Sequence, residues 1–328
     1  MGTPKVMEKF AVGVDFGGTK ISAGVVNLES GRLVGTAKKK TRQVQEQDDV
    51  IRRIITVVDD AINESGVDMR KIAGIGIGAA GMVNREKGIL LAAVNIGAND
   101  VPLAEPLSRH YGLPCKLGND VEVATIGEMA FGAGRDCKNF VCIFVGTGIG
   151  SGIVQNGTLV RGATGTAGEV GHITLYPDGK LCGCGAYGCL EAYASRTAVA
   201  KDILADLQRG HDSVIREKVD MTKGILRSKA IAQAVASGDE MVTGAVEQAA
   251  RCMATGLVTV INFLNPQRII LGGGLVEAVN LYFDTAELYA RRRCLKIPGR
   301  KIEIVRAELG DYAGIVGAAM LSRNGASK

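Results

Sequence analysis

The feature of this sequence that most constrains its fold is a glycine-rich turn set between two short apolar strands, and it occurs twice. The first copy occupies residues 13–26 and the second residues 141–156. Strand, glycine turn and strand together predict a β-hairpin, and glycine allows the backbone of such a turn to come close to a ligand. Two such hairpins, one in each half of the chain, are much more specific evidence for a ligand-binding function than either hairpin would be alone.

The tips of both hairpins have the chemistry of an anion-binding site, because a tip presents successive backbone N–H groups. Side-chain donors accompany them in both copies: Thr19, Lys20, Thr147 and Ser151. Asp15, at the end of the first strand, is suited to hold Mg²⁺ through water. A strand rather than a helix follows Lys20, which excludes a Walker A loop and a dinucleotide-binding turn. For each tip the alternative is a glycine turn that binds nothing.

A cluster of cysteine and histidine lies in residues 168–191. Cys182 and Cys184 form a C-x-C pair, and Cys189 follows after four more residues. His172 precedes the pair by ten residues. Three thiolates and one imidazole suit a tetrahedral zinc ion, and an ion with four protein ligands has a structural role. The sequence therefore predicts a zinc ion that holds this loop, with reduced cysteines or a disulfide between two of them as the alternatives.

The length and composition indicate a globular chain of about two domains. The net charge is +5, aromatic residues make up 4% and Trp is absent, so a nucleic-acid surface is not expected. The basic runs 38–40 and 291–293 are interpreted as solvated faces. No apolar stretch is long enough for a membrane segment, and the N-terminus lacks the pattern of a signal peptide. The other cysteines are scattered, as expected for free thiols in a reducing cytoplasm.

Hydrophobic periodicity predicts the main elements. We expect helices over 48–66, 121–131 and 239–264, the last ended by Pro266. A strand over 268–271 leads into the glycine turn 272–274, and a helix over 312–322 closes the chain. A hinge near 118–120 divides the domains. On the second helix, Glu122 and Glu128 are expected to be exposed surface carboxylates.

Six segments resemble, in order and approximate spacing, the motifs of the ROK family of sugar kinases in the actin-like ATPase superfamily. They run from residue 12 to 275 and read VGVDFGGTK, GNDVEVATIGE, GTGIGSGIV, GATGTAGEVGH, CGCGAYGCLEAYAS and LGGGL. The resemblance implies an α/β fold, the two-lobed actin-like ATPase (ribonuclease H-like) fold, with a hinge between lobes and a zinc-pinned loop. It implies an N-terminal lobe of residues 1–118, joined by the C-terminal helix at about 311–328. A C-terminal lobe of residues 119–310 would carry the zinc motif and a dimer surface.

The same resemblance implies roles for individual residues. Asp120 corresponds to the general base that takes a proton from a sugar hydroxyl. Sugar contacts would come from Asn119, Asp120, Glu169, His172 and Glu191, and from loops that contain Gly81 and Asn95. His172 would hold zinc through one ring nitrogen and face the sugar with the other. ATP would be bound, with Mg²⁺, by Asp15, Gly17, Gly18, Thr19, Lys20, Gly146, Thr147, Gly148 and Gly150, and its adenosine by Gly272, Gly273 and Gly274.

The activity that the resemblance implies is ATP-dependent phosphorylation of a hexose, with glucose as the leading substrate. Ala98 stands where many relatives carry Trp, so N-acetylmannosamine, mannose and fructose stay open as substrates, and polyphosphate as donor. Sugar-responsive repressors of the family carry an N-terminal helix-turn-helix, whereas only about ten residues precede the first strand here. A sugar-binding protein without catalysis is the third reading. The resemblance also implies a homodimer or a dimer of dimers.

Overall fold

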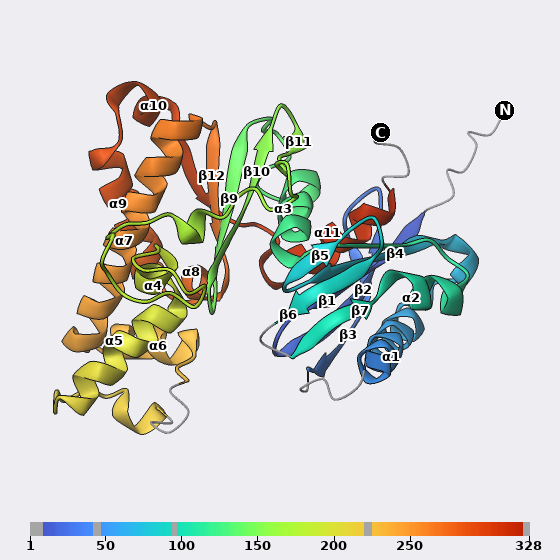
Figure 1. The fold of residues 1–328 in the computed structure, drawn as a ribbon, viewed down its shortest axis with the longest axis horizontal. Helices are drawn as coiled ribbons and strands as arrows, with labels where there is room; N and C mark the ends of the chain where they lie inside the picture. The colour runs from blue at the N-terminus through green and yellow to red at the C-terminus, as the bar shows by residue number, and fades with distance from the viewer. Residues whose placement is uncertain (1–8, 42–46, 94–96, 220–224, 324–328) are drawn as a thin grey trace. The chain divides into compact units, whose positions relative to one another are not determined.

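Two five-stranded sheets with the same strand order carry the two glycine hairpins (Figure 1). The computed structural model describes residues 9–41, 47–93, 97–219 and 225–323. In each sheet three antiparallel strands form a meander, and two further strands run parallel to the first of them. The expected strand–turn–strand pattern is therefore confirmed at both places.

The first sheet has the order β3-β2-β1-β4-β8. Its strands are β1 (Phe10–Phe16), β2 (Lys20–Asn27), β3 (Leu33–Lys40), β4 (Ile72–Ala79) and β8 (Cys115–Asn119). The helices are α1 (Gln47–Ser65), α2 (Ala104–Tyr111), α3 (Asp120–Phe131) and α11 (Ala313–Arg323). Helix α1 packs on β2 and β3, and α11 packs on β1 and β4. A small antiparallel sheet is added by β5 (Met82–Asn84), β6 (Ile89–Ala93) and β7 (Ala98–Pro102).

The C-terminal helix α11 lies directly on the first sheet because two strand positions lack a side chain. A Cβ at Gly13 would lie 1.8 Å from the carbonyl oxygen of Ile315, and one at Gly76 would lie 1.7 Å from that of Ala318. Only glycine leaves room for backbone to pack on backbone at these places. The last helix is thereby built into the core of the first sheet.

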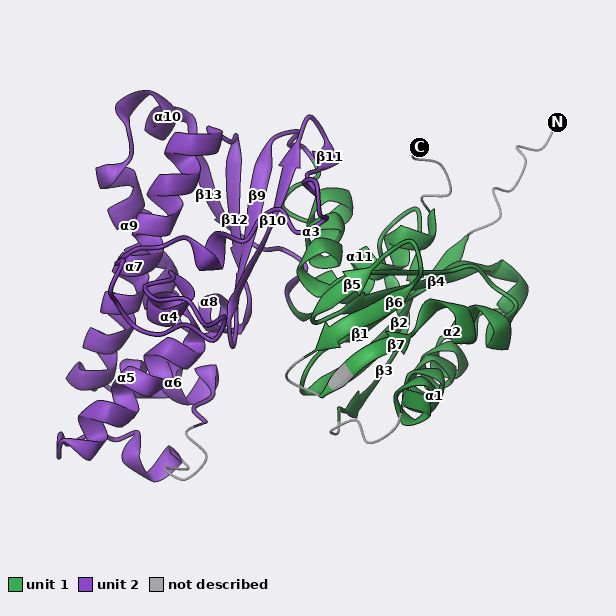
Figure 2. Ribbon diagram, viewed as in Figure 1, with its two compact units in different colours: residues 1–135, 311–328 green, residues 136–310 purple. Residues whose placement is uncertain are grey.

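The chain divides into two compact units (Figure 2). One comprises residues 1–135 with 311–328, and the other residues 136–310. The boundary expected from the sequence was at 118–119, whereas helix α3 belongs to the first unit. The reason is its close packing against α11, where a Cβ at Gly317 would lie 1.6 Å from the carbonyl oxygen of Val123.

The second sheet has the order β11-β10-β9-β12-β13. Its strands are β9 (Phe140–Val145), β10 (Ile149–Gln155), β11 (Thr158–Leu159), β12 (Arg268–Gly272) and β13 (Glu303–Arg306). The helices are α4 (Glu191–Ala194), α5 (Arg196–Gln208), α6 (Ser228–Ala236), α7 (Glu240–Leu264), α8 (Gly274–Ala278), α9 (Asn280–Arg293) and α10 (Lys296–Lys301). Short 3₁₀ turns lie at Met69–Lys71, Val170–His172, Arg216–Lys218 and Gly310–Tyr312.

The long helix expected over 239–264 is confirmed as α7. Asp239 caps its N-terminus by accepting a hydrogen bond from the Val242 N–H, and Asn265 ends it in the left-handed conformation just before Pro266. Its apolar face is buried against α5 and α9, so most of the helix belongs to the core of the second unit.

No helix in the described parts of the chain is both long and apolar enough to cross a membrane.

Two expectations about carboxylates on α3 are wrong. Glu122 is 7% exposed and Glu128 is fully buried. Glu128 accepts a hydrogen bond from the Ala133 N–H at 2.8 Å and so closes the turn after the helix, whereas Glu122 forms an ion pair with Arg85, in the turn after β5. Both acids are buried because each has a partner that satisfies its charge. The basic runs 38–40 and 291–293 are exposed, as expected.

Candidate active site and metal centre

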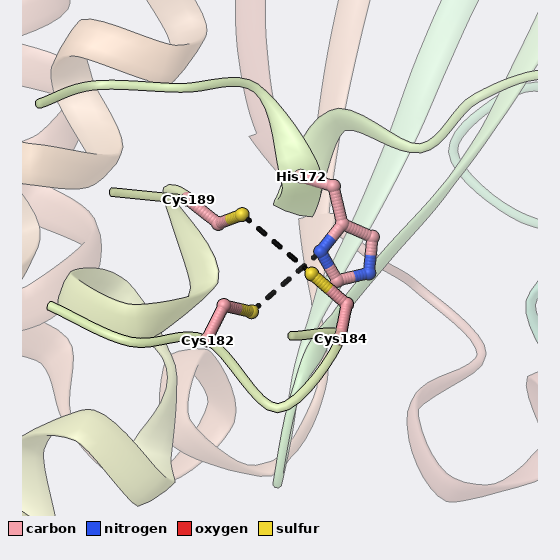
Figure 3. A group of neighbouring side chains, drawn as sticks. All are labelled: His172, Cys182, Cys184 and Cys189. Atoms are coloured by element: carbon pink, nitrogen blue, oxygen red, sulfur yellow. Dashed lines mark hydrogen bonds between the residues drawn. The ribbon is translucent and has the colours of Figure 1, made fainter. Parts of the chain in front are cut away.

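Three cysteines and one histidine converge in the second unit (Figure 3). One ligand atom from each of His172, Cys182, Cys184 and Cys189 lies within 4.8 Å of all the others. His172 comes from the 3₁₀ turn Val170–His172, and the cysteines come from the loop that follows it. Isolated bridges from Thr174 to Cys189 and from Leu181 to Tyr187 hold the two arms of that loop together.

The spacing of the ligand atoms fits a metal ion. The Sγ atoms of Cys184 and Cys189 are 3.8 Å apart, and Cys182 Sγ is 3.7 Å from His172 Nδ1. A tetrahedral zinc ion with bonds of about 2.3 Å to sulfur places two sulfurs about 3.8 Å apart. A disulfide requires about 2.05 Å, and all eight cysteines are free thiols. The structure therefore favours a metal cluster over the disulfide alternative.

A close backbone contact shapes the segment 172–189 that carries the four residues of the cluster, called the metal loop below. Gly188 has a φ of +77°, and a Cβ there would lie 1.6 Å from the carbonyl oxygen of Tyr176. Tyr193 holds the same loop by accepting a hydrogen bond from the Lys180 N–H at 2.6 Å. The glycine lets the chain fold back on itself, which brings Cys189 beside the other two cysteines.

The two ring nitrogens of His172 face different groups. Nδ1 points at Cys182 Sγ, and Nε2 lies 3.9 Å from Glu169 Oε2. Glu191 Oε1 accepts from the Cys182 thiol at 3.5 Å. Two of the proposed sugar contacts, Glu169 and Glu191, therefore lie beside the cluster of His172 and the three cysteines. His172 itself belongs to the cluster and directs its second ring nitrogen toward Glu169.

Glu191 also attaches the metal loop to the second hairpin. Its Oε2 accepts a hydrogen bond from the Ile149 N–H at 2.8 Å. A Cβ at Gly148 would lie only 2.3 Å from that same oxygen, so the carboxylate occupies the space beside the turn. The glycine at this position is needed for the close approach of Glu191.

The second hairpin tip leaves donors available for an anion. The Gly146 N–H donates to the Gly148 carbonyl at 2.9 Å and closes the turn. Among the described residues, the N–H groups of Thr147 and Gly148 have no hydrogen-bond partner. Arg196 Nη2 donates to Thr147 Oγ1 at 2.6 Å, and burial lowers the pKa of this arginine. Arg196 was not expected here, because no local pattern marks an arginine that reaches a loop 49 residues earlier.

The glycine turn 272–274 lies beside this hairpin. Gly272 ends β12 opposite Phe144 of β9, and Gly274 begins α8. Gly273 has a φ of +89°, and a Cβ there would lie 2.6 Å from the backbone nitrogen of Val145. The expected adenosine element is thus adjacent to the end of β9, where the turn of the second hairpin begins.

The first hairpin tip also leaves backbone N–H groups available, although it is one residue longer than the second between the donor and acceptor that close it. The Gly17 N–H donates to the Lys20 carbonyl at 3.0 Å, and the N–H groups of Gly18 and Thr19 are without a partner in the described part of the chain. Burial raises the pKa of Asp15, although the positive charge of Lys20 opposes the shift. Lys20 Nζ is 3.6 Å from Asp311. Asp311 was not expected here, since it lies about 290 residues away in the sequence.

Asn119 and Asp120 begin helix α3. Asn119 Oδ1 caps the helix by accepting from the N–H groups of Val121 and Glu122, and its Nδ2 donates to the Gly81 carbonyl at 3.1 Å. Burial raises the pKa of Asp120 to about 6, and the negative charge of Asp15 adds to the shift. A carboxylate with a pKa near neutrality is suited to accept a proton.

The predicted site residues thus fall into two groups. Asp15, Lys20, Gly81, Asn119 and Asp120 lie in the first unit, and Glu169, His172, Glu191 and the glycines 146–150 and 272–274 lie in the second. Asn95 lies outside the described residues. Within each group, carboxylates and a tip with available N–H groups are chemically suited to bind sugar hydroxyls and phosphate oxygens.

A model described as "ROK family" matches residues 11–324. The glucokinase of Streptomyces coelicolor is 36% identical over 95% of this chain and 97% of its own. The solved ROK family glucokinase of Streptomyces griseus, in complex with glucose and AMPPNP, has 36% identity and a TM-score of 0.83 over 96% of this chain and 100% of its own. A ROK family transcriptional regulator, homologous to the Escherichia coli MLC protein, has 27% identity and a TM-score of 0.84, covering 97% of this chain and 78% of its own.

Proposed function

The chain belongs to the ROK family, and we propose that it is a hexose kinase that phosphorylates glucose with ATP. The observation that carries the proposal is its likeness, over nearly the whole chain, to a glucokinase solved with glucose and AMPPNP. The regulator that it resembles is longer than the matched region. The available N–H groups at both hairpin tips and the raised pKa of Asp120 support the kinase over the regulator.

Asp120 is the general base in this proposal. The attacking sugar hydroxyl gives its proton to the Asp120 carboxylate, and Asn119 holds the sugar by a hydrogen bond. Burial keeps the pKa of Asp120 near neutrality, so that the carboxylate is ionised at pH 7 and still basic enough to accept the proton. The N-cap of Asn119 keeps both residues in a defined position at the start of α3.

The two hairpins hold the phosphate chain of ATP. The N–H groups of Gly18, Thr19, Thr147 and Gly148 donate to phosphate oxygens, and Lys20 adds a positive charge. Asp15 is placed to hold the water shell of Mg²⁺, which when bound with ATP neutralises the charge of its phosphates. Adenosine binds at the turn 272–274, which the missing side chain of Gly273 lets pack against the backbone of Val145 at the end of β9.

The metal cluster supports the sugar contacts. His172, Cys182, Cys184 and Cys189 would hold zinc, and the ion would supply structural cross-linking rather than chemistry, because no coordination position is left open. Glu169 and the Nε2 atom of His172 then contact sugar hydroxyls. Glu191 shares this role through the oxygen that faces Cys182, while its other oxygen holds the second hairpin.

The protein is further proposed to form a homodimer or a dimer of dimers through the second unit. Phe263, Leu295 and Ile297 are 85%, 61% and 82% exposed. They lie near one another, since the Leu295 N–H donates to Asn262 Oδ1 at 3.0 Å. Apolar side chains gathered on a surface in this way are typical of an interface. Light scattering of the parent and of Phe263→Ser/Ile297→Ser tests this: a monomeric parent would contradict it.

The free thiols support a cytoplasmic location.

A coupled assay over a panel of sugars tests the proposed activity. Glucose, mannose, fructose, N-acetylmannosamine and N-acetylglucosamine are offered with MgATP or with polyphosphate. The expected result is the highest kcat/KM for glucose with ATP. A higher kcat/KM for another sugar, or with polyphosphate as donor, would replace glucose or ATP as the proposed substrate and leave the proposal of a sugar kinase in place. Glucose binding by calorimetry without phosphorylation of any sugar would favour a regulator or a silent binding protein and contradict the kinase.

A further inference from the structure

A partly buried ion pair connects the first turn of α3 to the turn that follows β5. Arg85 Nε donates to Glu122 Oε2 at 2.6 Å, and the side chains are 27% and 7% exposed. An acidic residue in the first turn of a helix is favoured by the helix dipole. The dipole acts equally on an exposed side chain, so it does not explain why Glu122 is buried against an arginine 37 residues earlier.

A second contact joins the same two elements. Asn119 Nδ2 donates to the Gly81 carbonyl at 3.1 Å. Gly81 and Arg85 flank β5, so both ends of this three-residue strand are attached to the first turn of α3. Met82, Glu86 and Lys87 around it are exposed, and β5 pairs with β6 along one edge. Besides its pairing with β6 and its contacts with β8, β5 is thus attached to the first turn of α3 at both of its ends.

Asp120 lies between the two points of attachment. Asn119 precedes it and Glu122 follows two residues later, and the Asp120 Oδ1 itself accepts from the Val121 N–H at 3.0 Å. The direction of its carboxylate therefore follows the backbone of this turn. A displacement of about 1 Å at a reacting group can reduce the rate about 10²-fold, so whatever holds the turn also governs the reaction.

We infer that Arg85 and Glu122 are positioning residues for the phosphoryl transfer: their ion pair holds the first turn of α3, and with it Asp120, against β5. The inference rests on the proposed function for its link to Asp120. Neither side chain is required to touch the substrate. The pair acts on the geometry of the base and leaves ATP binding at the hairpins unaffected.

The variant that tests the pair is Arg85→Gln/Glu122→Gln. Changing Arg85 alone leaves the charge of the buried Glu122 without this counterion, which destabilises a protein strongly, whereas the double change removes both charges and keeps two hydrogen-bonding groups. Lys39→Gln/Asp60→Asn is the matched control, because it removes an ion pair of 2.9 Å on the surface of the same unit. Thermal unfolding confirms that each variant is folded.

Two measurements are made on the full chain. In the Arg85/Glu122 variant kcat for the best sugar is expected to fall at least about tenfold while KM for ATP stays within twofold, and in the control both stay unchanged. Hydrogen exchange of peptides that cover 118–123 and 81–86 is expected to accelerate in the variant and not in the control. A kcat within threefold of the parent, or unchanged exchange in both peptides, would overturn the inference.

Failure of the proposed function can be distinguished from failure of this inference, because the two lead to different experimental results. If the parent phosphorylates no sugar, the kinase proposal fails, and hydrogen exchange alone decides whether the ion pair holds the turn. If the double variant does not fold, Glu122→Gln alone is measured in the same way, since its amide keeps an acceptor oxygen for Arg85. The same direction of change is expected there, and no change in kcat or exchange would overturn the inference.

Discussion

Glu191 Oε2 accepts a hydrogen bond of 2.8 Å from the Ile149 N–H. The acceptor follows the last cysteine of the metal cluster by two residues, and the donor opens the second strand of the glycine hairpin. The oxygen on the other side of the carboxylate faces the Cys182 thiol. One side chain thus links the cysteine cluster to the turn of the second hairpin, for which phosphate binding is proposed.

This contact predicts that Gly148→Ala destabilises the protein. The added Cβ would lie 2.3 Å from Glu191 Oε2 and displace the carboxylate, with an expected loss of about 1–3 kcal/mol in the free energy of unfolding. Gly146→Ala is the control, because a Cβ at Gly146 meets nothing within 4 Å. Thermal or urea unfolding measures both. Equal losses in the two variants would contradict a role for the Glu191 contact.

The metal cluster predicts about one zinc ion per chain in the purified protein. Cys184→Ser is expected to lose the ion and to unfold at a lower temperature, because the loop loses its cross-link. Elemental analysis after dialysis measures the zinc content. Cys137→Ser, which changes a cysteine outside the cluster, should keep the metal. A metal-free parent with full activity would disprove the zinc assignment.

Asp120→Asn is expected to reduce kcat at least about 10²-fold, since an amide cannot accept the proton of the sugar hydroxyl. Glucose binding, measured by calorimetry, should stay within about threefold of the parent, because the amide oxygen still accepts from the Val121 N–H. Glu29→Gln, on an exposed turn of the same unit, serves as control. Activity within threefold of the parent would exclude Asp120 as the base.

The raised pKa of Asp120 predicts the pH dependence of activity. Burial places this pKa at about 6, and the base works only when ionised. The value of kcat/KM for the sugar should therefore be constant above pH 7 and fall about tenfold per unit below pH 6. An initial-rate profile at saturating MgATP measures it. An unchanged kcat/KM from pH 7 to pH 5 would contradict the assignment.

The same shift has a consequence for stability. The pKa of Asp120 is higher in the folded state than the value of about 3.9 in an unfolded chain, so the folded state binds more protons. The contribution of Asp120 to stability is then full below pH 4 and is lost as the pH rises through 6. The free energy of unfolding of Asp120→Asn minus that of the parent should therefore be more positive at pH 7.5 than at pH 4. A pH-independent difference in the free energy of unfolding would contradict the shift.

Local patterns were enough to predict much of the site. The two hairpins, the metal ligands and helix α7 are each encoded by neighbouring residues: glycines between apolar runs, cysteines at short spacing, and an apolar face every three to four residues. The structure confirms the hairpins and the convergence of His172 with the three cysteines. The roles assigned to Asp120, Glu169 and the glycine loops stay predictions that the experiments above address.

The errors and omissions share a physical cause. Glu122 and Glu128 carry the polarity of surface residues, and partners such as Arg85 and the Ala133 N–H make their burial favourable. Arg196 and Asp311 reach the hairpin tips from distant parts of the chain. No local pattern records such partners, because a residue's own type does not specify which neighbour will satisfy its charge.

By itself, the sequence determined the main elements, the two glycine hairpins and the set of cysteine and histidine residues that converge, since these depend on backbone propensity and on spacing within a few residues. Tertiary structure alone decided that α11 packs on β1 and β4 at Gly13 and Gly76, and that α3 belongs to the first unit. It also decided which acids are buried. Such outcomes depend on how the folded elements fit together, and packing is a property of surfaces that local sequence does not describe.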